Sequence, residues 1–435
     1  MNGTERKQRM DTSSLMEQIV SKENLNAAYL QVIRNKGAEG VDGMEYTELG
    51  EYLSKNGETI KEQLRTRKYK PQPVRRVEIP KPEGGIRKLG VPTVTDRFIQ
   101  QAVAQVLIPI FEEQFHDHSY GFRPNRCAQQ AVLTALEMMN DGQSWIVDID
   151  LEKFFDTVNH DKLMTIVGRT IKDGDVISLV RKFLVSGVMI DEEYEESVIG
   201  TPQGGNISPL LANIMLNEMD KEMEVRGLDF VRYADDCIIM VGSELAANRV
   251  MKSISKFIEE KLGLKVNVSK SKVDNPQGIK YLGFGFYYDS FAKQYKAKPH
   301  VKSVEKFKAR MKELTCRSWG VRNSYKIEKL NQLIRGWINY FKIGNMKTLS
   351  KKLDSNIRYR LRMCIWKHWK TPQNRAKQLI KLGVPSWSAW KTAYLHGFAK
   401  PCRCGDVQIA ITNKRLADFG LISMLDYYTQ RCVIC

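Results

Sequence analysis

The 435-residue sequence predicts an α+β fold that is followed by a basic, all-helical segment. Short runs of alternating apolar residues predict the strands of an antiparallel sheet. Between these runs, apolar residues recur every three or four positions and predict helices. Beyond about residue 290 the strand pattern ends, the helical spacing continues, and lysine and arginine become frequent. A chain of this length accommodates about two to four domains.

The strand pattern recurs along the first 290 residues. Two runs flank Gly84-Gly85 and predict a hairpin with a basic tip. A third run ends in two aspartates, and a fourth is interrupted by Asp235-Asp236, which predicts two short strands joined by a tight turn. The expected strands cover residues 74–79, 86–91, 145–151, 230–241, 264–269 and 279–288.

Helical spacing occupies most of the remaining sequence. Ser208-Pro209 precedes an apolar run and predicts a helix that begins with Ser208 as its N-cap. The other expected helices cover residues 96–111, 127–139, 244–262, 301–315, 324–343 and 347–369.

The positive charge is concentrated near the C-terminus. Residues 291–400 hold 27 Lys and Arg against four Asp and Glu, whereas the whole chain holds 68 against 50. Such a block favours a nucleic-acid partner, because neutralising phosphates releases counterions and strengthens binding. A basic face that serves solubility is the alternative, although solubilising surfaces usually mix both signs.

Aromatic residues are interleaved with these basic residues. Base stacking would use exposed rings, whereas a helical bundle would bury them, and for any single ring the core is favoured. The set comprises Trp319, Trp337, Tyr340, Phe341, Tyr359, Trp366 and Trp369.

Membrane, signal and zinc-site patterns are weak. No apolar run approaches the roughly 18 residues of a membrane span, and the first residues lack a signal-peptide core, so a cytoplasmic protein without membrane contact is expected. Cys402 and Cys404 have an unusual spacing for a zinc knuckle, and with Cys432 and Cys435 they are expected to be free thiols rather than zinc ligands.

Aspartates supply the candidate chemistry. Asp235 and Asp236 lie at the expected hairpin turn, where a divalent cation such as Mg²⁺ would relieve their repulsion. An ordinary exposed turn explains the same pair equally well. Asp148 and Asp150 share one face of their strand. Carboxylates at the ends of two strands could together hold the two metal ions that catalyse nucleotidyl transfer.

Seven sequence blocks, taken together, resemble the reverse transcriptases encoded by bacterial group II introns, in particular the compact C-class maturases. Six of them lie in the sheet-forming part before residue 290, and the seventh lies in the basic segment. They are Tyr233-Ala-Asp-Asp236, Asp148-Ile-Asp-Leu-Glu-Lys-Phe-Phe-Asp156, Gly200-Thr-Pro-Gln-Gly-Gly-Asn-Ile-Ser-Pro209, Ser119-Tyr-Gly-Phe-Arg-Pro-Asn125, Ile79-Pro-Lys-Pro-Glu-Gly-Gly-Ile-Arg87, Tyr281-Leu-Gly-Phe284 and Gly336-Trp-Ile-Asn-Tyr-Phe341.

The resemblance implies roles for the acidic motifs. Asp150, Asp235 and Asp236 would be catalytic metal ligands for two Mg²⁺ ions, with Mn²⁺ as a substitute. Phe155, five residues after Asp150, would exclude a ribose 2′ hydroxyl, and this spacing favours Asp150 over Asp148. Leu151 is included among both the metal-binding and the nucleotide-binding candidates.

The resemblance also implies nucleotide contacts outside these motifs. Gln203 would lie against the incoming nucleotide, and Lys81 and Arg87 would hold its triphosphate, unless these two are solvent-facing loop cations. Lys272, and Lys270 beside it, are expected near the active site.

The implied architecture is a right-hand polymerase. Residues 1–290 would form the fingers and palm (palm mainly 90–115 and 140–290), 291–370 a basic helical thumb and maturase domain, and 371–435 a small DNA-binding module. Neither an HNH nor an RNase H nuclease pattern is visible. The partners would be group II intron RNA, an RNA template with a DNA primer, target DNA and deoxynucleoside triphosphates, and a homodimer is left open.

Two alternatives remain open at this point. A retron, diversity-generating or CRISPR-associated reverse transcriptase would share the catalytic blocks. An RNA-folding maturase without polymerase activity would be free to lose Asp150, Asp235 and Asp236, and their presence argues against it.

Overall fold

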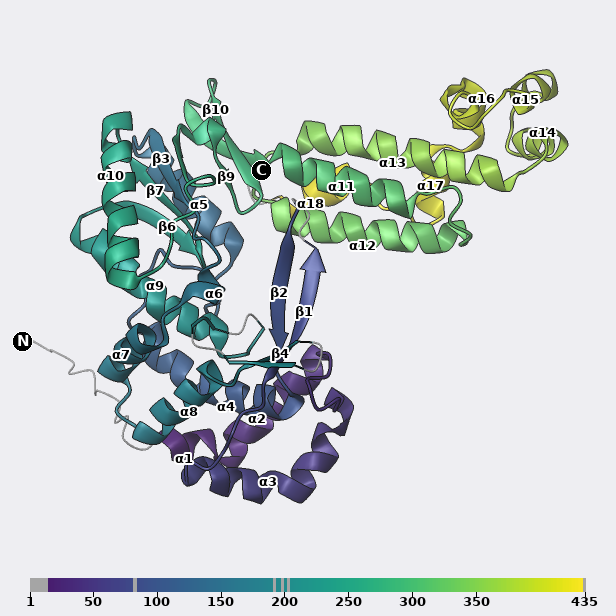
Figure 1. Ribbon diagram of the computed structural model, residues 1–435. Coiled ribbons are helices and arrows are strands. Elements are labelled where there is room, and N and C mark those ends of the chain that lie inside the picture. The colour runs from purple at the N-terminus through teal and green to yellow at the C-terminus, as the bar shows by residue number, and fades with distance from the viewer. Residues whose placement is uncertain (1–14, 81–83, 191–192, 197–198, 202–203, 433–435) are drawn as a thin grey trace, which may run out of the picture. The chain divides into compact units, whose positions relative to one another are not determined.

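The computed structural model describes residues 15–80, 84–190, 193–196, 199–201 and 204–432. Its contacts divide the chain into two units, residues 1–274 and 275–435 (Figure 1). The domain boundaries expected near residues 290 and 370 stay predictions. No helix within the described residues is long and apolar enough to cross a bilayer.

The first unit contains two four-stranded sheets. The hairpin β1 (Val74–Pro80) and β2 (Ile86–Val91) is antiparallel, as expected, and β4 (Val188–Ile190) and β5 (Glu193–Glu195) extend it in the order β2-β1-β4-β5. The second sheet has the order β6-β7-β3-β8 and is antiparallel throughout. Its strands are β3 (Trp145–Ile149), β6 (Asp229–Tyr233), β7 (Asp236–Val241) and β8 (Lys272–Asp274).

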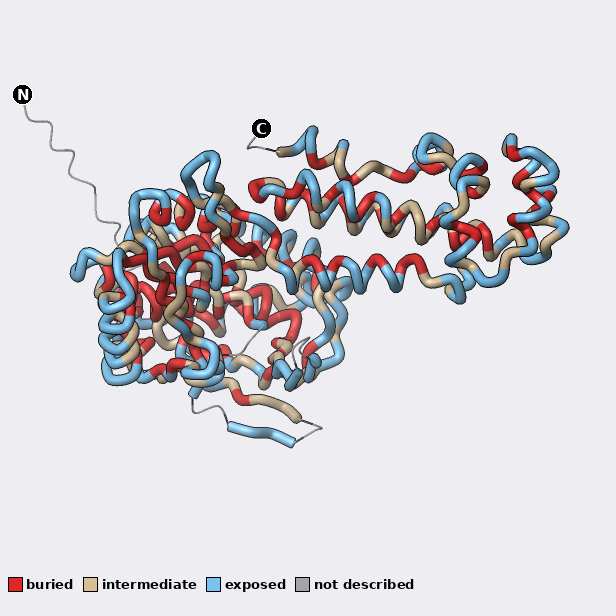
Figure 2. The backbone as a smooth tube through the Cα atoms, turned by 90° about the horizontal axis from the view of Figure 1, so that it is seen from above, coloured by how far each residue is buried: buried red, intermediate tan, exposed pale blue. Residues whose placement is uncertain are grey.

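Helices pack against the second sheet and share an apolar core with it. Val147, Ile149 and Ile239 lie in this core, and Ile146 and Ile238, which alternate with them, are buried as well. Both faces of the second sheet are therefore covered. Figure 2 shows the dense block of buried residues in this unit. The helices are α1 (Leu15–Ile19), α2 (Lys22–Asn35), α3 (Leu49–Arg65), α4 (Val94–Glu112), α5 (Ala128–Asn140), α6 (Phe154–Thr157), α7 (His160–Thr170), α8 (Gly174–Leu184), α9 (Ser208–Val225) and α10 (Glu244–Phe257).

Three local expectations are wrong. α9 starts at Ser208 itself and Ile207 precedes it, so Ser208 does not cap the helix. Residues 264–269 form only an isolated bridge between Val266 and Leu151, and the regular strand β8 begins at Lys272. The segment 279–288 is two strands, because Leu282 and Gly283 adopt positive φ angles of 48° and 81° and turn the chain.

The second unit combines a small sheet with three long helices. The sheet has the order β11-β10-β9, from β9 (Lys280–Tyr281), β10 (Phe284–Asp289) and β11 (Gln294–Pro299). The long helices are α11 (Val301–Leu314), α12 (Asn323–Phe341) and α13 (Lys347–His368). Short helices follow: α14 (Pro372–Lys381), α15 (Ser386–Ala393), α16 (Gly405–Ala410), α17 (Asn413–Asp418) and α18 (Met424–Arg431).

Two of the sequence blocks meet inside this unit. The Phe284 ring lies 4.8 Å from the ring of Phe341 and 5.7 Å from that of Tyr340. The Tyr340 hydroxyl also donates a hydrogen bond of 2.9 Å to the carbonyl of Leu282. The block 281–284 is thus joined to α12 by aromatic packing.

A buried carboxylate attaches α18 to α13. Asp354 accepts hydrogen bonds from the backbone N–H groups of Met424 (2.8 Å) and Leu425 (3.0 Å) and from the Ser423 hydroxyl (3.0 Å). These donors lie at the first turn of α18, where the backbone N–H groups lack partners within the helix.

We expect Asp354→Ala to loosen α18. Removing the acceptor leaves buried donors unsatisfied, at a cost of about 1–3 kcal/mol. Hydrogen exchange by mass spectrometry should show exchange about tenfold or more faster in peptides covering Met424–Arg431. The exposed Asp418→Ala variant is the control, and equal exchange in both variants would refute this attachment.

Candidate active site

Three aspartates gather at one end of the second sheet. Tyr233 in β6 pairs with Asp236 in β7, so Ala234 and Asp235 form the two-residue turn between them, with Ala234 at φ 57°. On the other side of β7, Ile149 of β3 pairs with Cys237. The next position in this antiparallel register brings Asp150, just after β3, opposite Asp236 at the start of β7. The strand register therefore places the end of β3 beside the Asp235-Asp236 turn.

The environment of Asp235 disfavours its negative charge. Burial raises the pKa of its carboxyl above the usual value, and the nearby Asp150 carboxylate raises it further. The guanidinium groups of Arg87 and Arg232 act in the opposite direction. The structure thus brings Arg87, from the β1–β2 hairpin, within electrostatic reach of Asp235.

Asp150 is held by the segment that precedes β8. Its backbone N–H donates to the Ser271 hydroxyl (3.0 Å), and its carbonyl accepts from the Asn267 N–H (2.8 Å). Its carboxylate lies 3.5 Å from the ammonium of Lys270. Lys272 pairs in register with Asp148 instead. Lys270 thus lies beside the Asp150 carboxylate and Lys272 opposite Asp148, and a nucleotide contact by Lys272 stays a prediction.

A buried arginine binds the backbone of this turn. Arg232 is 0% exposed and forms a two-bond ion pair with Asp220 of α9, at 2.7 and 2.5 Å. It also donates to the side chain of Asn213 and to the carbonyl of Ala234, both at 3.0 Å. The sequence did not single out these residues, although a charged residue inside an apolar strand was a usable signal.

The block 119–125 packs directly against the same turn. Tyr120 donates its N–H to the carbonyl of Arg232 (2.8 Å), and Asn213 donates to the carbonyl of Gly121 (2.8 Å). A Cβ atom added to Gly121 would lie 2.2 Å from the backbone nitrogen of Ala234. Only glycine permits this approach.

Phe155 lies in α6, a few residues beyond Asp150. Its ring is half-buried, and its carbonyl accepts a hydrogen bond of 2.6 Å from the N–H of Thr201. Gly200 donates to the carbonyl of Val158 (2.8 Å). The Gly200 block therefore starts against α6. Leu151, between Asp150 and α6, is buried.

Two of the predicted nucleotide contacts, Lys81 and Gln203, lie outside the described residues. Their immediate neighbours are described in part. A Cβ atom on Gly204, which has a φ of 133°, would lie 2.5 Å from the carbonyl oxygen of Gly90 in β2. Gly204 itself therefore lies against the base of the β1–β2 hairpin.

The carboxylates suit a hard divalent cation, which prefers oxygen ligands. Asp150 and Asp235 are close enough for one to raise the pKa of the other, and a cation would relieve that repulsion. Within the described residues, no three or more His, Cys, Asp or Glu side chains converge on one point that could hold a metal ion, and this includes Asp150, Asp235 and Asp236. A cation here would therefore need oxygen ligands from the substrate as well. Cys402 is buried, Cys404 and Cys432 are half-buried, and Cys435 lies outside the described residues.

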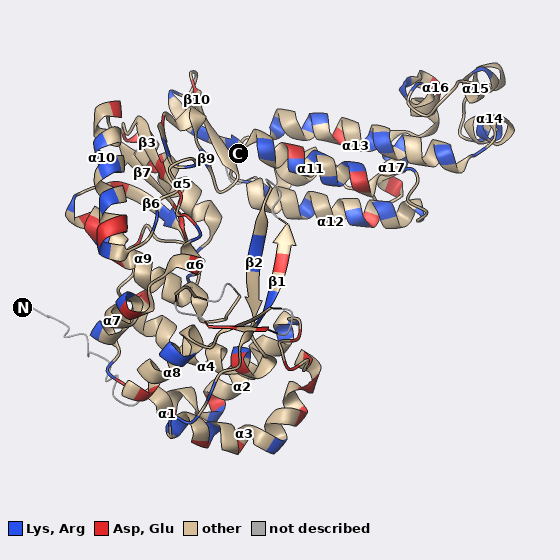
Figure 3. Cartoon of the chain, viewed as in Figure 1, with Lys and Arg blue, Asp and Glu red and all other residues tan. Residues whose placement is uncertain are grey.

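The second unit carries the basic surface. Lys and Arg are distributed along α11, α12 and α13 (Figure 3). Two aromatic residues of the expected set belong to the core: Trp366 is fully buried and Phe341 nearly so. By contrast, Trp387 of α15 is 74% exposed.

Fold and site together define a right-hand nucleic-acid polymerase, and comparisons with known proteins agree. The family model for reverse transcriptase (RNA-dependent DNA polymerase) matches residues 79–286, and the model for the group II intron maturase-specific domain matches residues 304–383. Protein YkfC of Escherichia coli is 33% identical over 62% of this chain and 81% of its own length.

Intron-encoded proteins are also similar. The group II intron-encoded protein LtrA of Lactococcus lactis is 40% identical over 45% of this chain, and a putative COX1/OXI3 intron 2 protein of Saccharomyces cerevisiae is 29% identical over 58%. The match spans 32% and 35% of those two proteins. The chain therefore belongs to the group II intron-encoded reverse transcriptases, RNA-directed DNA polymerases that carry a maturase domain.

Similarity to solved structures is more distant. A partial Cas6-RT-Cas1–Cas2 complex aligns with 57% of this chain and 43% of its own, at 23% identity and a TM-score of 0.36. Telomerase from Candida albicans in complex with a fragment of telomeric RNA aligns with 76% and 65%, at 14% identity and a TM-score of 0.43.

We expect Gly121→Ala to displace the Asp235 turn. The added methyl group would overlap the backbone of Ala234, which should cost about 1–3 kcal/mol of folding free energy and reduce primer extension. Gly57→Ala, in open space on α3, is the control and should be neutral or slightly stabilising. Wild-type stability and activity for Gly121→Ala would show that the turn lies elsewhere.

Proposed function

We propose that the chain extends a DNA primer on an RNA template, with Asp150, Asp235 and Asp236 as the residues that hold two Mg²⁺ ions. The observation that carries this proposal is the strand register, in which the end of β3 meets the β6–β7 turn. Mn²⁺ would serve in place of Mg²⁺, because both accept carboxylate oxygens.

The reaction joins the primer 3′ oxygen to the α-phosphorus of a deoxynucleoside triphosphate and releases pyrophosphate. Bound cations would stabilise the negative charge on the attacking and leaving oxygens. Asp235 and Asp150 orient that site because backbone contacts fix both: the β6–β7 turn for Asp235, and the contacts to Ser271 and Asn267 for Asp150.

The surroundings of the carboxylates suit a nucleotide. Arg87 of β2 is close enough to Asp235 to lower the pKa of its carboxyl, and a guanidinium is suited to bind phosphate oxygens bidentately. Phe155, in the short helix after Asp150, would lie under the sugar and exclude a 2′ hydroxyl. Lys81 and Gln203 remain candidates from the sequence motifs, as do Leu151 and Lys272.

Binding of the parent intron RNA is the second part of the proposal. The maturase-specific match covers most of α11 through α14, where cationic side chains predominate. We assign intron RNA to this surface, and splicing and mobility of the intron to the bound complex. The cytoplasm, where transcripts and nucleotides meet, is the expected location.

Asp235→Asn should abolish primer extension. The substitution keeps the size of the side chain but removes the negative charge that a cation requires. We expect at least a ~100-fold loss of rate on an RNA template with Mg²⁺, as for removal of a major electrostatic contribution to a transition state. Asp418→Asn, an exposed aspartate on α17, is the control. Equal rates for the two variants would disprove the metal site.

Phe155→Ala should admit ribonucleotides. With the ring removed, a 2′ hydroxyl no longer meets a steric barrier, and the preference for deoxynucleotides should fall by about tenfold or more. Single-nucleotide incorporation kinetics with matched ribo- and deoxynucleotides measure this preference. Phe291→Ala, at a fully exposed ring, should leave it unchanged. If Phe155→Ala does the same, sugar selection lies elsewhere.

A further inference from the structure

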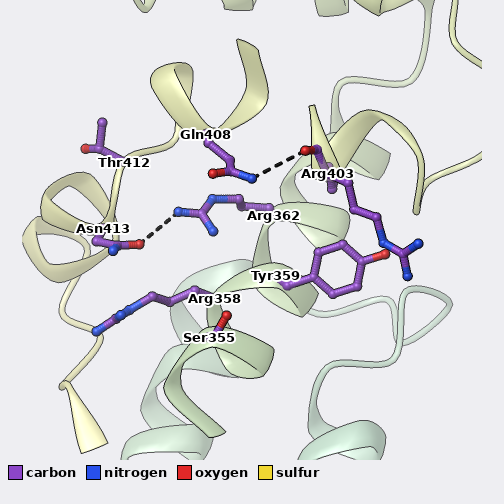
Figure 4. Close-up of a pocket in the computed structure, with 9 residues that line it drawn as sticks. Ser355, Arg358, Tyr359, Arg362, Arg403, Gln408, Thr412 and Asn413 are labelled. Atoms are coloured by element: carbon purple, nitrogen blue, oxygen red, sulfur yellow. Dashed lines mark hydrogen bonds between the residues drawn. The ribbon is translucent and has the colours of Figure 1, made fainter. Parts of the chain in front are cut away.

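The second unit contains a polar cavity of about 510 Å³ between α13 and the segment 402–413 (Figure 4). One wall is formed by Arg358, Tyr359 and Arg362, which lie close together on one side of α13. Arg403 and Asn413 line it from the facing segment. One wall lies inside the maturase-specific match and the other lies beyond it.

The lining of this cavity is cationic. It includes three arginines and no aspartate or glutamate. Arg358 forms an ion pair of 3.6 Å with Asp354, which also accepts three hydrogen bonds from the start of α18 and does not line the cavity. Burial lowers the pKa of Arg362, and the nearby charge of Arg358 lowers it further.

Arg362 is held as a fixed donor. Its Nε donates to the carbonyl of Ile411 (2.8 Å), and its Nη2 donates to the side chain of Asn413 (2.9 Å). Both partners are neutral, so they orient the guanidinium and leave its charge uncompensated. A planar guanidinium held in this way suits a phosphate group.

An aromatic surface lies beside these cations. The guanidinium of Arg403 is 5.6 Å from the centre of the Tyr359 ring, and the Tyr359 hydroxyl donates to the carbonyl of Ala399 (3.3 Å). An arginine over an aromatic ring forms a flat surface on which a nucleobase can stack. The cavity volume falls in the range of small-ligand sites, which is about 300–1,000 Å³.

We propose that this cavity binds one nucleotide of a single-stranded segment of the intron RNA. Arg358 and Arg362 hold its phosphate, and the Tyr359–Arg403 surface contacts its base. RNA is the assigned strand because the wall that carries Arg358, Tyr359 and Arg362 belongs to the maturase-specific match. The assignment rests on the intron RNA partner under the proposed function, and it adds a defined site to that partner.

The test measures RNA affinity by fluorescence anisotropy with a short labelled single-stranded RNA and the full chain. Arg358→Gln/Arg403→Gln removes two charges from the cavity and keeps Arg362, which joins α13 to the facing segment. Lys351→Gln/Lys352→Gln removes two charges from exposed positions on the same helix and is the matched control.

We expect the cavity pair to weaken RNA binding by about tenfold or more, and the control pair by clearly less. The slope of affinity against salt should also fall by about 0.7 for each lost phosphate contact. Arg358→Lys/Arg403→Lys should recover part of the affinity, which a purely structural role of these side chains would not predict. Equal losses in the cavity and control pairs would overturn the proposal.

Further measurements distinguish a failure of the cavity proposal from a failure of the polymerase proposal. Unlabelled DNA of the same sequence should compete less well than RNA, and equal competition would overturn the assignment to RNA. If the wild-type protein does not extend a primer, the polymerase proposal fails. The comparison of RNA affinity between the cavity pair and the control pair still tests the cavity proposal in that case.

Discussion

The buried ion pair between Arg232 and Asp220 is the interaction on which the catalytic end of the sheet depends. A fully buried guanidinium is stable only with a charged partner and satisfied hydrogen bonds, and removing one partner costs about 3–5 kcal/mol. Here the partners come from α9 and from the β6–β7 turn, since Arg232 also binds Asn213 and the Ala234 carbonyl. The pair therefore fixes a helix and the Asp235 turn in a single arrangement.

This arrangement extends to the other functional segments. Asn213 binds the carbonyl of Gly121, and Gly121 packs against Ala234 too closely for any side chain. On the far side of β7, strand register alone places Asp150 next to Asp236. Distant sequence blocks thus become one site through backbone contacts.

Much of this organisation was accessible from the sequence, because hydrophobic periodicity is local. The β1–β2 hairpin, the β6–β7 hairpin and the long helices were each expected close to their observed positions. Residues 264–269 were wrongly expected to form a strand. Their apolar residues alternate as in a strand, but only Val266 pairs, in an isolated bridge with Leu151. Pairings between distant residues have no local signature, which is why Arg232–Asp220 and Asp150–Ser271 were missed. The cavity around Arg358 and Arg403 was missed for the same reason.

The most direct measurement is a crystal structure with an RNA template, a DNA primer, a deoxynucleoside triphosphate and Mn²⁺, examined by anomalous scattering. The account predicts an anomalous peak bound by the carboxylates of Asp150 and Asp235, with Phe155 next to the sugar of the nucleotide. A peak bound by Asp148 instead of Asp150, or one away from the β6–β7 turn, would contradict it.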